Sequence, residues 1–197
     1  MRIQKLVSVF LGVVFFLGAG ALLASAAQEP QTTEEFTAWV DQQAGIMKSG
    51  MVTIKIERWS TPEERAEIVA AIKQGGQDEM LKVVQKLPKV GIILFPGAPA
   101  YDLRYAYQFP TNDGGRNIVI GTDRIIARDK VTAGSPSMDY PFTLIQMRLD
   151  AKGEGEGHAA FGVKISVSKD GSGVELESYI DTPTMLKNVK SKVKEAK

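Results

Sequence analysis

The chain has 197 residues with 24 basic and 23 acidic side chains, one histidine and no cysteine. A nearly neutral domain has no electrostatic footprint for nucleic acid, so we expect no nucleic-acid partner. The lack of cysteine excludes thiol nucleophiles and lipid attachment at a lipobox. The single histidine, His158, excludes zinc motifs that need two histidines from one chain.

The first residues have the three-part pattern of a secretory signal peptide. Two basic residues precede an apolar run over residues 6–23, and small residues follow it. We therefore predict a signal peptide over residues 1–27, cleaved after Ala26 or Ala27, and a periplasmic or secreted protein without a stable membrane anchor. An uncleaved anchor is the alternative, because the run approaches the roughly 20 residues that span a bilayer.

Residues 28–197 are expected to form a single domain, long enough to bury a core without disulfides. A short helix is predicted from Thr32 to Gly45, because Thr32 and Glu35 fit a capping box. Strict alternation of apolar and polar residues predicts a strand over residues 51–59. The apolar side of the short helix would consist of Phe36, Trp39 and Val40.

A helical hairpin is predicted from Thr61 to Leu87. Thr61 can cap the first helix, Pro62 suits its first position, and Glu64 completes a capping box. Two glycines at 75–76 end that helix, and apolar residues at helical spacing predict a second helix over residues 78–87. A hairpin inserted between strands indicates an α+β fold rather than a doubly wound one.

Further strands are predicted on both sides of two turns. Residues 90–95 are apolar enough for a strand buried on both faces. Residues 101–109 and 116–124 form a hairpin around the turn at 112–115. One face of the first hairpin strand would carry Tyr101, Leu103, Tyr105, Tyr107 and Phe109.

The stretch from 139 to 180 alternates most cleanly and predicts three strands joined by glycine-rich turns. Such short turns connect antiparallel neighbours, so the stretch is a meander. The lysine-rich segment from about residue 187 is interpreted as a solvated, partly frayed tail. The predicted fold is therefore α+β: an antiparallel, curved sheet, a half-barrel or sandwich of about seven strands, with the helical hairpin packed on one face.

Charged residues predict a cluster at one end of this sheet. If the hairpin pairs symmetrically about its turn, Asp102 and Arg104 fall near Asp123 and Arg124, beside the start of the meander. Such a cluster can be a binding site with shifted pKa values or a set of structural ion pairs, and the tyrosines can line a pocket or a core. The candidate ligand-binding residues are Asp102, Arg104, Tyr105, Asp123, Arg124, Asp139 and Tyr140.

Metal and cofactor sites are not expected. Asp150, Glu154 and Glu156 offer carboxylates among glycines, but their spacing does not match the EF-hand register, and turn chemistry explains them. His158 opens a strand as an exposed edge residue, so we predict no catalytic role for it.

The segments YDLRYAYQFPTNDGGRNIVIGTDR and DYPFTLIQMRLDAKGEGEG resemble those of a family of exported bacterial proteins of unknown function. The resemblance covers residues 60–189 and implies a shared fold and compartment, without an activity, a substrate or site residues. From the residues themselves we predict a non-catalytic envelope domain that binds a small ligand or a protein partner. One alternative is a hydrolase or isomerase that uses the carboxylates of Asp102, Asp123 or Asp139 with Arg124 as electrophile. The other is a structural or assembly subunit.

Overall fold

The computed structural model describes residues 33–41, 49–126, 142–167, 174–178 and 184–194. The predicted signal peptide and two candidate site residues, Asp139 and Tyr140, lie outside these ranges. Within them the chain forms eleven strands and one kinked helix, α1 (Pro62–Lys86). The strands are β1 (Thr33–Val40), β2 (Gly50–Ile56), β3 (Gly91–Leu94), β4 (Ala100–Leu103), β5 (Tyr105–Pro110), β6 (Arg116–Thr122), β7 (Thr143–Leu149), β8 (Glu154–Phe161), β9 (Val163–Val167), β10 (Val174–Ser178) and β11 (Thr184–Lys194).

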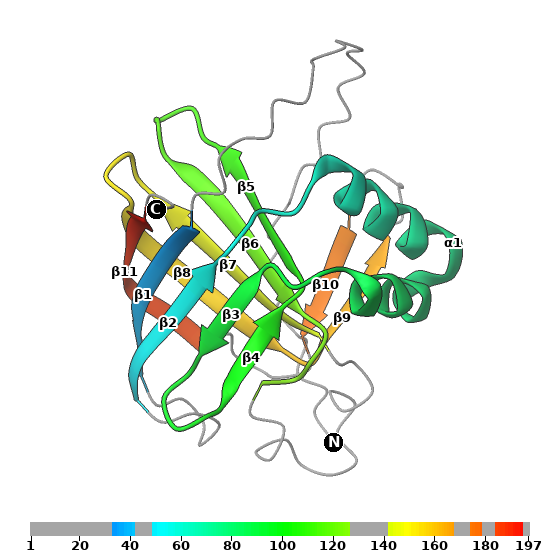
Figure 1. Ribbon diagram of the computed structural model, residues 1–197, viewed down its shortest axis with the longest axis horizontal. Helices are drawn as coiled ribbons and strands as arrows, with labels where there is room; N and C mark the ends of the chain where they lie inside the picture. The colour runs from blue at the N-terminus through cyan, green and yellow to red at the C-terminus, as the bar shows by residue number, and fades with distance from the viewer. Residues whose placement is uncertain (1–32, 42–48, 127–141, 168–173, 179–183, 195–197) are drawn as a thin grey trace, which may run out of the picture.

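Nine of these strands form one antiparallel sheet that curls into a nearly closed barrel (Figure 1). The order is β4-β3-β2-β1-β11-β8-β7-β6-β5. The two end strands follow one another in the chain with only Arg104 between them, and the Arg104 amide donates to the Gly121 carbonyl of β6 at 3.0 Å. The predicted α+β class and antiparallel sheet are confirmed, but the strands outnumber the expected seven and close further than a half-barrel.

Alternation along the strands fills the barrel interior with large apolar side chains. In β2, Val52, Ile54 and Ile56 are at most 1% exposed, and the intervening side chains point outward. The strand predicted over residues 90–95 is buried on one face rather than on both, because Leu94 is 39% exposed. Other fully buried interior side chains are Phe36, Ile93, Leu103, Ile118, Ile120, Ile145, Met147, Leu149 and Phe161.

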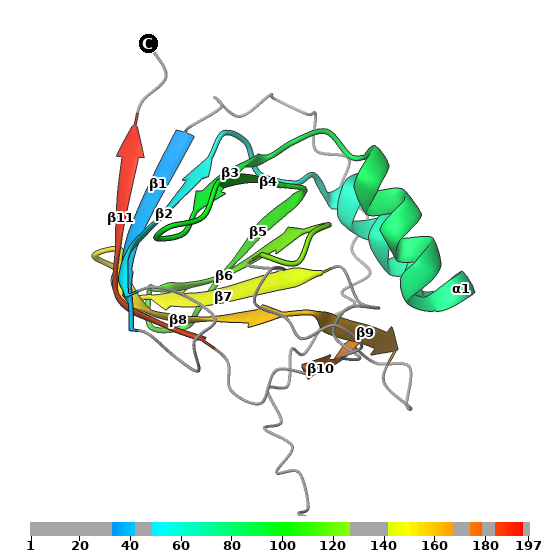
Figure 2. The same cartoon turned by 90° about the horizontal axis from the view of Figure 1, so that it is seen from below.

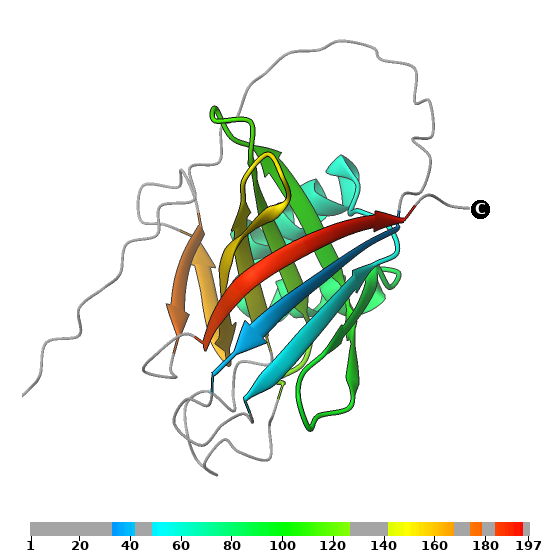
Figure 3. The same cartoon turned by 90° about the vertical axis from the view of Figure 1, so that its left-hand side faces the viewer.

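The predicted N-terminal helix is wrong: β1 is a strand between β2 and β11 (Figure 3). Phe36, Ala38 and Val40 are buried, whereas Trp39 is 46% exposed. Phe36 and Val40 are four residues apart, a spacing that fits a helix and a strand equally well. The buried Ala38 between them shows the period of two, and pairing on both sides outweighs the local capping signal.

The expected basic tail is a strand as far as Lys194. β11 pairs with β1 and with β8, and it buries Leu186 and Val189 in the barrel. Lys187, Lys190 and Lys192 point outward, where Lys190 pairs with Glu154 of β8 at 3.2 Å. The lysines thus mark a solvated face of a strand whose other face is in the core.

The helical hairpin is confirmed at both of its ends and at its bend. The Thr61 hydroxyl accepts from the Glu64 amide, and the Glu64 carboxylate accepts from the Thr61 amide, as a capping box requires. Gly75 and Gly76 have non-helical backbone angles and divide α1 into two limbs. The φ of +67° at Gly76 favours glycine, which explains why the bend occurs there.

The hairpin packs on the outside of the barrel and against β9 (Figure 2). β9 and β10 form a separate two-stranded sheet, which the chain enters at Gly162 with a φ of +58°. The predicted common face of the 159–167 strand is therefore split, because Phe161 lies in the barrel core and Val163 and Ile165 lie beneath α1. The second apolar cluster consists of Ile72, Met80, Val84, Phe142, Val163 and Ile165.

The glycine-rich stretch before His158 is also more ordered than a turn. β8 begins at Glu154, so the turn is confined to residues 150–153, and Gly155 and Gly157 pair with β7 and β11. In the described part of the chain, no helix is long and apolar enough to cross a membrane.

Candidate ligand-binding site

The outer face of β5 carries a row of aromatic side chains. Tyr105 and Tyr107 stack with ring centroids 6.4 Å apart, and Phe109 lies 4.7 Å beyond Tyr107. The predicted continuity of this row with Tyr101 and Leu103 is wrong. Arg104 interrupts the strand pairing, so Leu103 and Tyr101 pack with the barrel core and the later aromatics face outward.

Arg65, on the first limb of α1, reaches this aromatic row. Its guanidinium carbon lies 5.1 Å from the centroid of the Tyr107 ring and 5.6 Å from that of Phe109. These distances are within the range of cation–π attraction, which orients the guanidinium over the strand. Ile68, Val69 and Ile72 follow at helical spacing on the same side of α1.

A cavity of about 120 Å³ lies between α1 and the outer wall of the barrel. α1 and strands β5, β6, β7 and β9 supply its walls, which are mostly apolar. Four of its lining residues carry polar side chains: Arg65, Tyr105, Thr122 and Gln146. The remaining lining residues are Ile68, Val69, Ile72, Met80, Val84, Phe109, Val119, Gly121, Phe142, Leu144 and Ile165.

Burial raises the pKa of Tyr105 to about 12, and the charge of Arg65 and a hydrogen bond with it partly oppose this rise. The phenol is therefore neutral at physiological pH. A guanidinium has only N–H donors, so in that hydrogen bond the phenol oxygen accepts and the phenol proton stays available to another acceptor. Arg65 and Tyr105 are two of the four polar residues that line the cavity.

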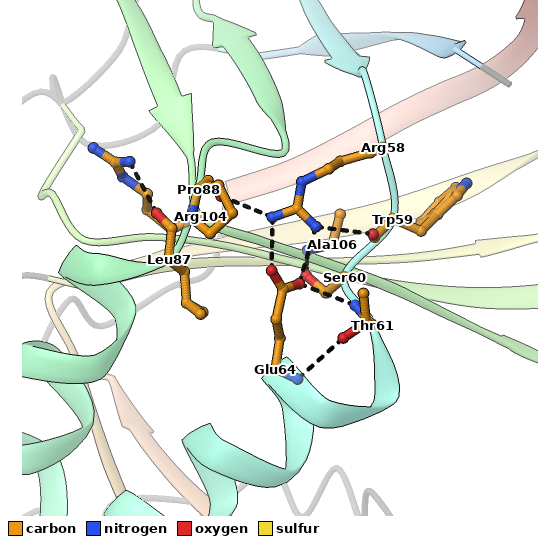
Figure 4. Close-up of polar contacts among 9 residues, drawn as sticks. All are labelled: Arg58, Trp59, Ser60, Thr61, Glu64, Leu87, Pro88, Arg104 and Ala106. Atoms are coloured by element: carbon orange, nitrogen blue, oxygen red, sulfur yellow. Dashed lines mark hydrogen bonds and ion pairs between the residues drawn. The ribbon is translucent and has the colours of Figure 1, made fainter. Parts of the chain in front are cut away.

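The base of the helical hairpin is fixed to the barrel by arginines (Figure 4). Arg58 binds the Glu64 carboxylate at 2.9 and 3.0 Å and donates to the Pro88 carbonyl at 3.0 Å. It therefore ties the start of α1 to Pro88, two residues past its end. Ser60 pairs with Ala106 of β5 through two hydrogen bonds of 2.8 and 3.1 Å. These contacts hold α1 over the cavity.

The predicted charged cluster is partly assembled at this base. Arg104 lies 3.9 Å from Asp123 and donates to the Leu87 carbonyl at 3.2 Å, so it links the barrel wall to the end of α1. Asp102 pairs instead with Lys89 at 3.6 Å, because β4 turns away to join β3. This arrangement is that of ion pairs that clamp an element in place.

The other predicted residues separate into different places. Arg124 is exposed, and its backbone carbonyl accepts from the Thr143 hydroxyl at 2.9 Å. Tyr105 lines the cavity. Asp139 and Tyr140 lie outside the described residues.

Sequence reasoning did not identify the helix side of the cavity. The usable signal was Arg65, a charged residue three and four positions before Ile68 and Val69 on the apolar side of a helix. Leu144 and Gln146 alternate with the buried Ile145 and Met147 of β7, and alternation alone cannot show that a helix covers the side that they face.

Carboxylates do not gather into a metal site within the described ranges, where no three His, Cys, Asp or Glu side chains lie close enough to hold an ion. In the β5–β6 turn, Asp113 accepts from the Gly115 amide and pairs with Arg148 at 2.6 Å. Hydrogen bonds from Thr111 and Gly115 hold the pKa of Asp113 below its usual value. This carboxylate therefore stabilises the turn to which it belongs.

Comparison with known proteins gives no relative from which a function can be transferred. No family model, no curated protein and no solved structure matches the chain. The function is therefore argued from the cavity and the residues that line it.

Proposed function

We propose that the protein is a non-catalytic domain of the cell envelope that binds a small, mostly apolar ligand in the cavity between α1 and the barrel wall. The observation that carries the proposal is an apolar cavity of about 120 Å³ with a few polar groups in its walls. Ligand pockets commonly have this composition. An apolar cavity of about 150 Å³ is enough to bind benzene, so the size suits a ring or a short alkyl chain.

The carboxylate-dependent enzyme has less support. Asp102 and Asp123 each pair with a cation of their own, and neither is among the residues that line the cavity. Two acids that act on one substrate, as in glycosidases, have to lie about 5 to 10 Å apart across an open cleft. A binding role fits the described residues better than carboxylate chemistry does.

An assembly subunit is the second candidate, because apolar side chains lie on the outer face of neighbouring strands. Trp39 is 46% exposed, and Met51, its direct cross-strand partner, is 62% exposed. Leu94 of β3 is 39% exposed on the next strand. Sedimentation of the protein at increasing concentration tests this role, which a Met51→Lys change would abolish by placing a charge in the contact.

Export is part of the proposal and depends on the sequence pattern of residues 1–27. Fractionation of expressing cells, followed by mass spectrometry of the mature N-terminus, tests it. A periplasmic or secreted product that begins at Ala27 or Gln28 is expected. A full-length product in the membrane fraction would instead indicate an uncleaved anchor.

Filling the cavity tests the binding site directly. Val69 lines the cavity, so Val69→Trp should occupy it and prevent the binding of benzene, measured by calorimetry and by the rise in melting temperature. Ala70 is exposed on the adjacent position of α1, and Ala70→Trp is the matched control that should bind like the wild type. Val69→Phe provides a smaller filling change, and circular dichroism checks that each variant is folded. Equal benzene binding by folded Val69→Trp would contradict the proposed site.

A further inference from the structure

An apolar patch lies on the outer face of neighbouring strands at one end of the barrel. Trp39 of β1 and Met51 of β2 are direct cross-strand partners, and both side chains are exposed. The exposed Leu94 of β3 is the partner of Thr53, so it lies diagonally next to Met51. Large apolar side chains that adjoin one another on a surface indicate a contact with another molecule, whereas scattered ones are ordinary.

No helix or strand of the described chain covers this face. Figure 3 shows it toward the viewer, with α1 on the far side of the barrel. The indole N–H of Trp39 donates to the Asp41 carboxylate at 3.1 Å, and Lys187 pairs with the same carboxylate. The polar group of the indole therefore has a partner within the chain, and the exposed part of the ring offers an apolar surface.

The charged side chains of this face alternate in sign from strand to strand. In one row of the pairing register, Lys192 of β11 is the partner of Glu35, and Glu35 is the partner of Lys55 of β2. Glu35 and Lys55 point outward, because they alternate with the buried Phe36 and Ile54. A partner surface of one sign, such as an anionic membrane, would attract some of these charges and repel the others. A second copy of the same face can offer each charge its opposite.

A two-fold axis that runs parallel to the strands, between β1 and β2, makes this face complementary to itself. Such an axis exchanges the two strands, so each residue of β1 faces the cross-strand partner that it has in its own chain, contributed by the other copy. Glu35 then faces Lys55 of the second copy, and Lys55 faces Glu35 of the second copy. By the same operation Trp39 faces Met51 of the second copy, which places an aromatic ring against a flexible thioether.

We infer that two copies of the protein form a two-fold dimer through the outer faces of β1 and β2. The row of Trp39 and the row of Glu35 lie four residues apart along β1, which is about 13 Å. Between them Thr37 pairs with Thr53, and these short side chains allow the two sheets to approach to the roughly 10 Å at which sheets pack. The inference gives the assembly role a partner and a geometry. It does not depend on a ligand in the cavity, which lies beneath α1.

Exchange of the two central charges tests this geometry. Glu35→Lys and Lys55→Glu should each raise the dissociation constant of the dimer at least about tenfold, because each places like charges opposite one another twice. An equimolar mixture of the two variants should dimerise like the wild type, since every charge then meets its opposite. The double variant should do so as well. Sedimentation of the mature protein at increasing concentration measures each dissociation constant.

Further variants locate the contact. Met51→Lys should also raise the dissociation constant at least about tenfold, because it places a charge against the apolar row. Glu67→Lys and Lys73→Glu reverse exposed charges of α1, on the far side of the barrel, and should leave the constant unchanged. Circular dichroism and urea denaturation check that each variant is folded.

The outcomes separate this dimer from other contacts. A wild type that stays monomeric at every concentration overturns the inference. Folded single variants that dimerise like the wild type, or a mixture that dimerises no better than either variant alone, overturn it as well. Pelleting of a monomeric wild type with vesicles of anionic phospholipid would instead assign the patch to a membrane surface. Benzene binding is measured separately, so none of these results decides the proposed ligand site.

Discussion

The barrel interior and the layer beneath α1 are both apolar, yet they are packed in different ways. Inside the barrel, Phe36, Phe161 and a set of isoleucines are at most 1% exposed. A barrel of about eight strands is just wide enough for side chains to fill it, and here they do. The outer layer is built from a helix laid on a curved wall, and it contains a cavity. The interior therefore supplies stability, and the outer layer contains the space in which we propose that a ligand binds.

The polar groups of the barrel interior also differ from those of the layer beneath α1. Glu34, 4% exposed, enters the interior from β1 and is bound by the Arg116 guanidinium and by the Ser191 hydroxyl. Arg116 also lies over the Phe36 ring at 5.8 Å. This network holds β1, β6 and β11 together at one end of the barrel. In the outer layer, by contrast, Arg65 and Tyr105 line the cavity beneath α1.

The largest expected difference in the free energy of unfolding is between alanine substitutions at two adjacent residues of β7. Ile145 is fully buried in the interior, and Leu144 points outward and lines the cavity. Ile145→Ala should lower the free energy of unfolding by about 4 kcal/mol, because it removes well-packed atoms and leaves a void. Leu144→Ala should cost about 1 to 2 kcal/mol, since its neighbours on one side are already absent. Urea denaturation of both variants measures the difference.

Equal costs for the two substitutions would contradict the distinction between a filled interior and a loosely packed outer layer. Ligand addition provides the control. A saturating apolar ligand should stabilise the wild type and the Ile145→Ala variant by the same increment. It should stabilise Leu144→Ala by a different amount, because that change enlarges the binding cavity itself.

The second prediction concerns the interior ion pair. Glu34→Gln leaves the Arg116 guanidinium without its charged partner and should cost about 2 kcal/mol. This value lies between that of a fully buried pair and that of a surface pair because the Arg116 side chain is 24% exposed. Glu154→Gln is the matched control, because it removes an exposed partner of Lys190 on the same β11 and should cost less than about 1 kcal/mol. Urea denaturation at low and high salt should show that only the smaller loss depends on salt.

Much of the fold was predictable because local signals agreed with the tertiary structure. Thr61, Pro62 and Glu64 start α1 where the capping rules place it, and the glycines at 75–76 bend it. The hairpin turn at 112–115 and the alternation of β2 and β7 were equally clear. In each case a short window of sequence contains the whole physical cause.

The remaining elements depend on partners far away in the chain. The sequence of β1 predicts a helix because Thr32 and Glu35 fit a capping box, whereas the two strands that pair with β1, β2 and β11, come from opposite ends of the domain. At Arg104 and at Gly162, the side of the chain that faces the barrel interior is reversed. This reversal is a consequence of barrel closure, which no local sequence pattern encodes. The site was only partly predictable for the same reason: Tyr105 belonged to a visible aromatic row, but the helix that completes its cavity packs there only in three dimensions.

The smallest expected effect on stability comes from the titration of Tyr105, whose side chain belongs to the outer layer beneath α1. Because burial raises the pKa of its phenol from 10.0 to about 12, the folded protein retains this proton at a pH where the unfolded chain releases it. The resulting contribution to stability is complete below pH 10 and is lost as the pH rises from about 10 to about 12.

Absorbance at 295 nm should show a phenolate component with a midpoint near pH 12, absent from Tyr105→Phe. Arg65→Gln should move this component to still higher pH, because the positive charge that favours the phenolate is removed. A component unaffected by Arg65→Gln would place Arg65 too far from Tyr105 to influence its phenol.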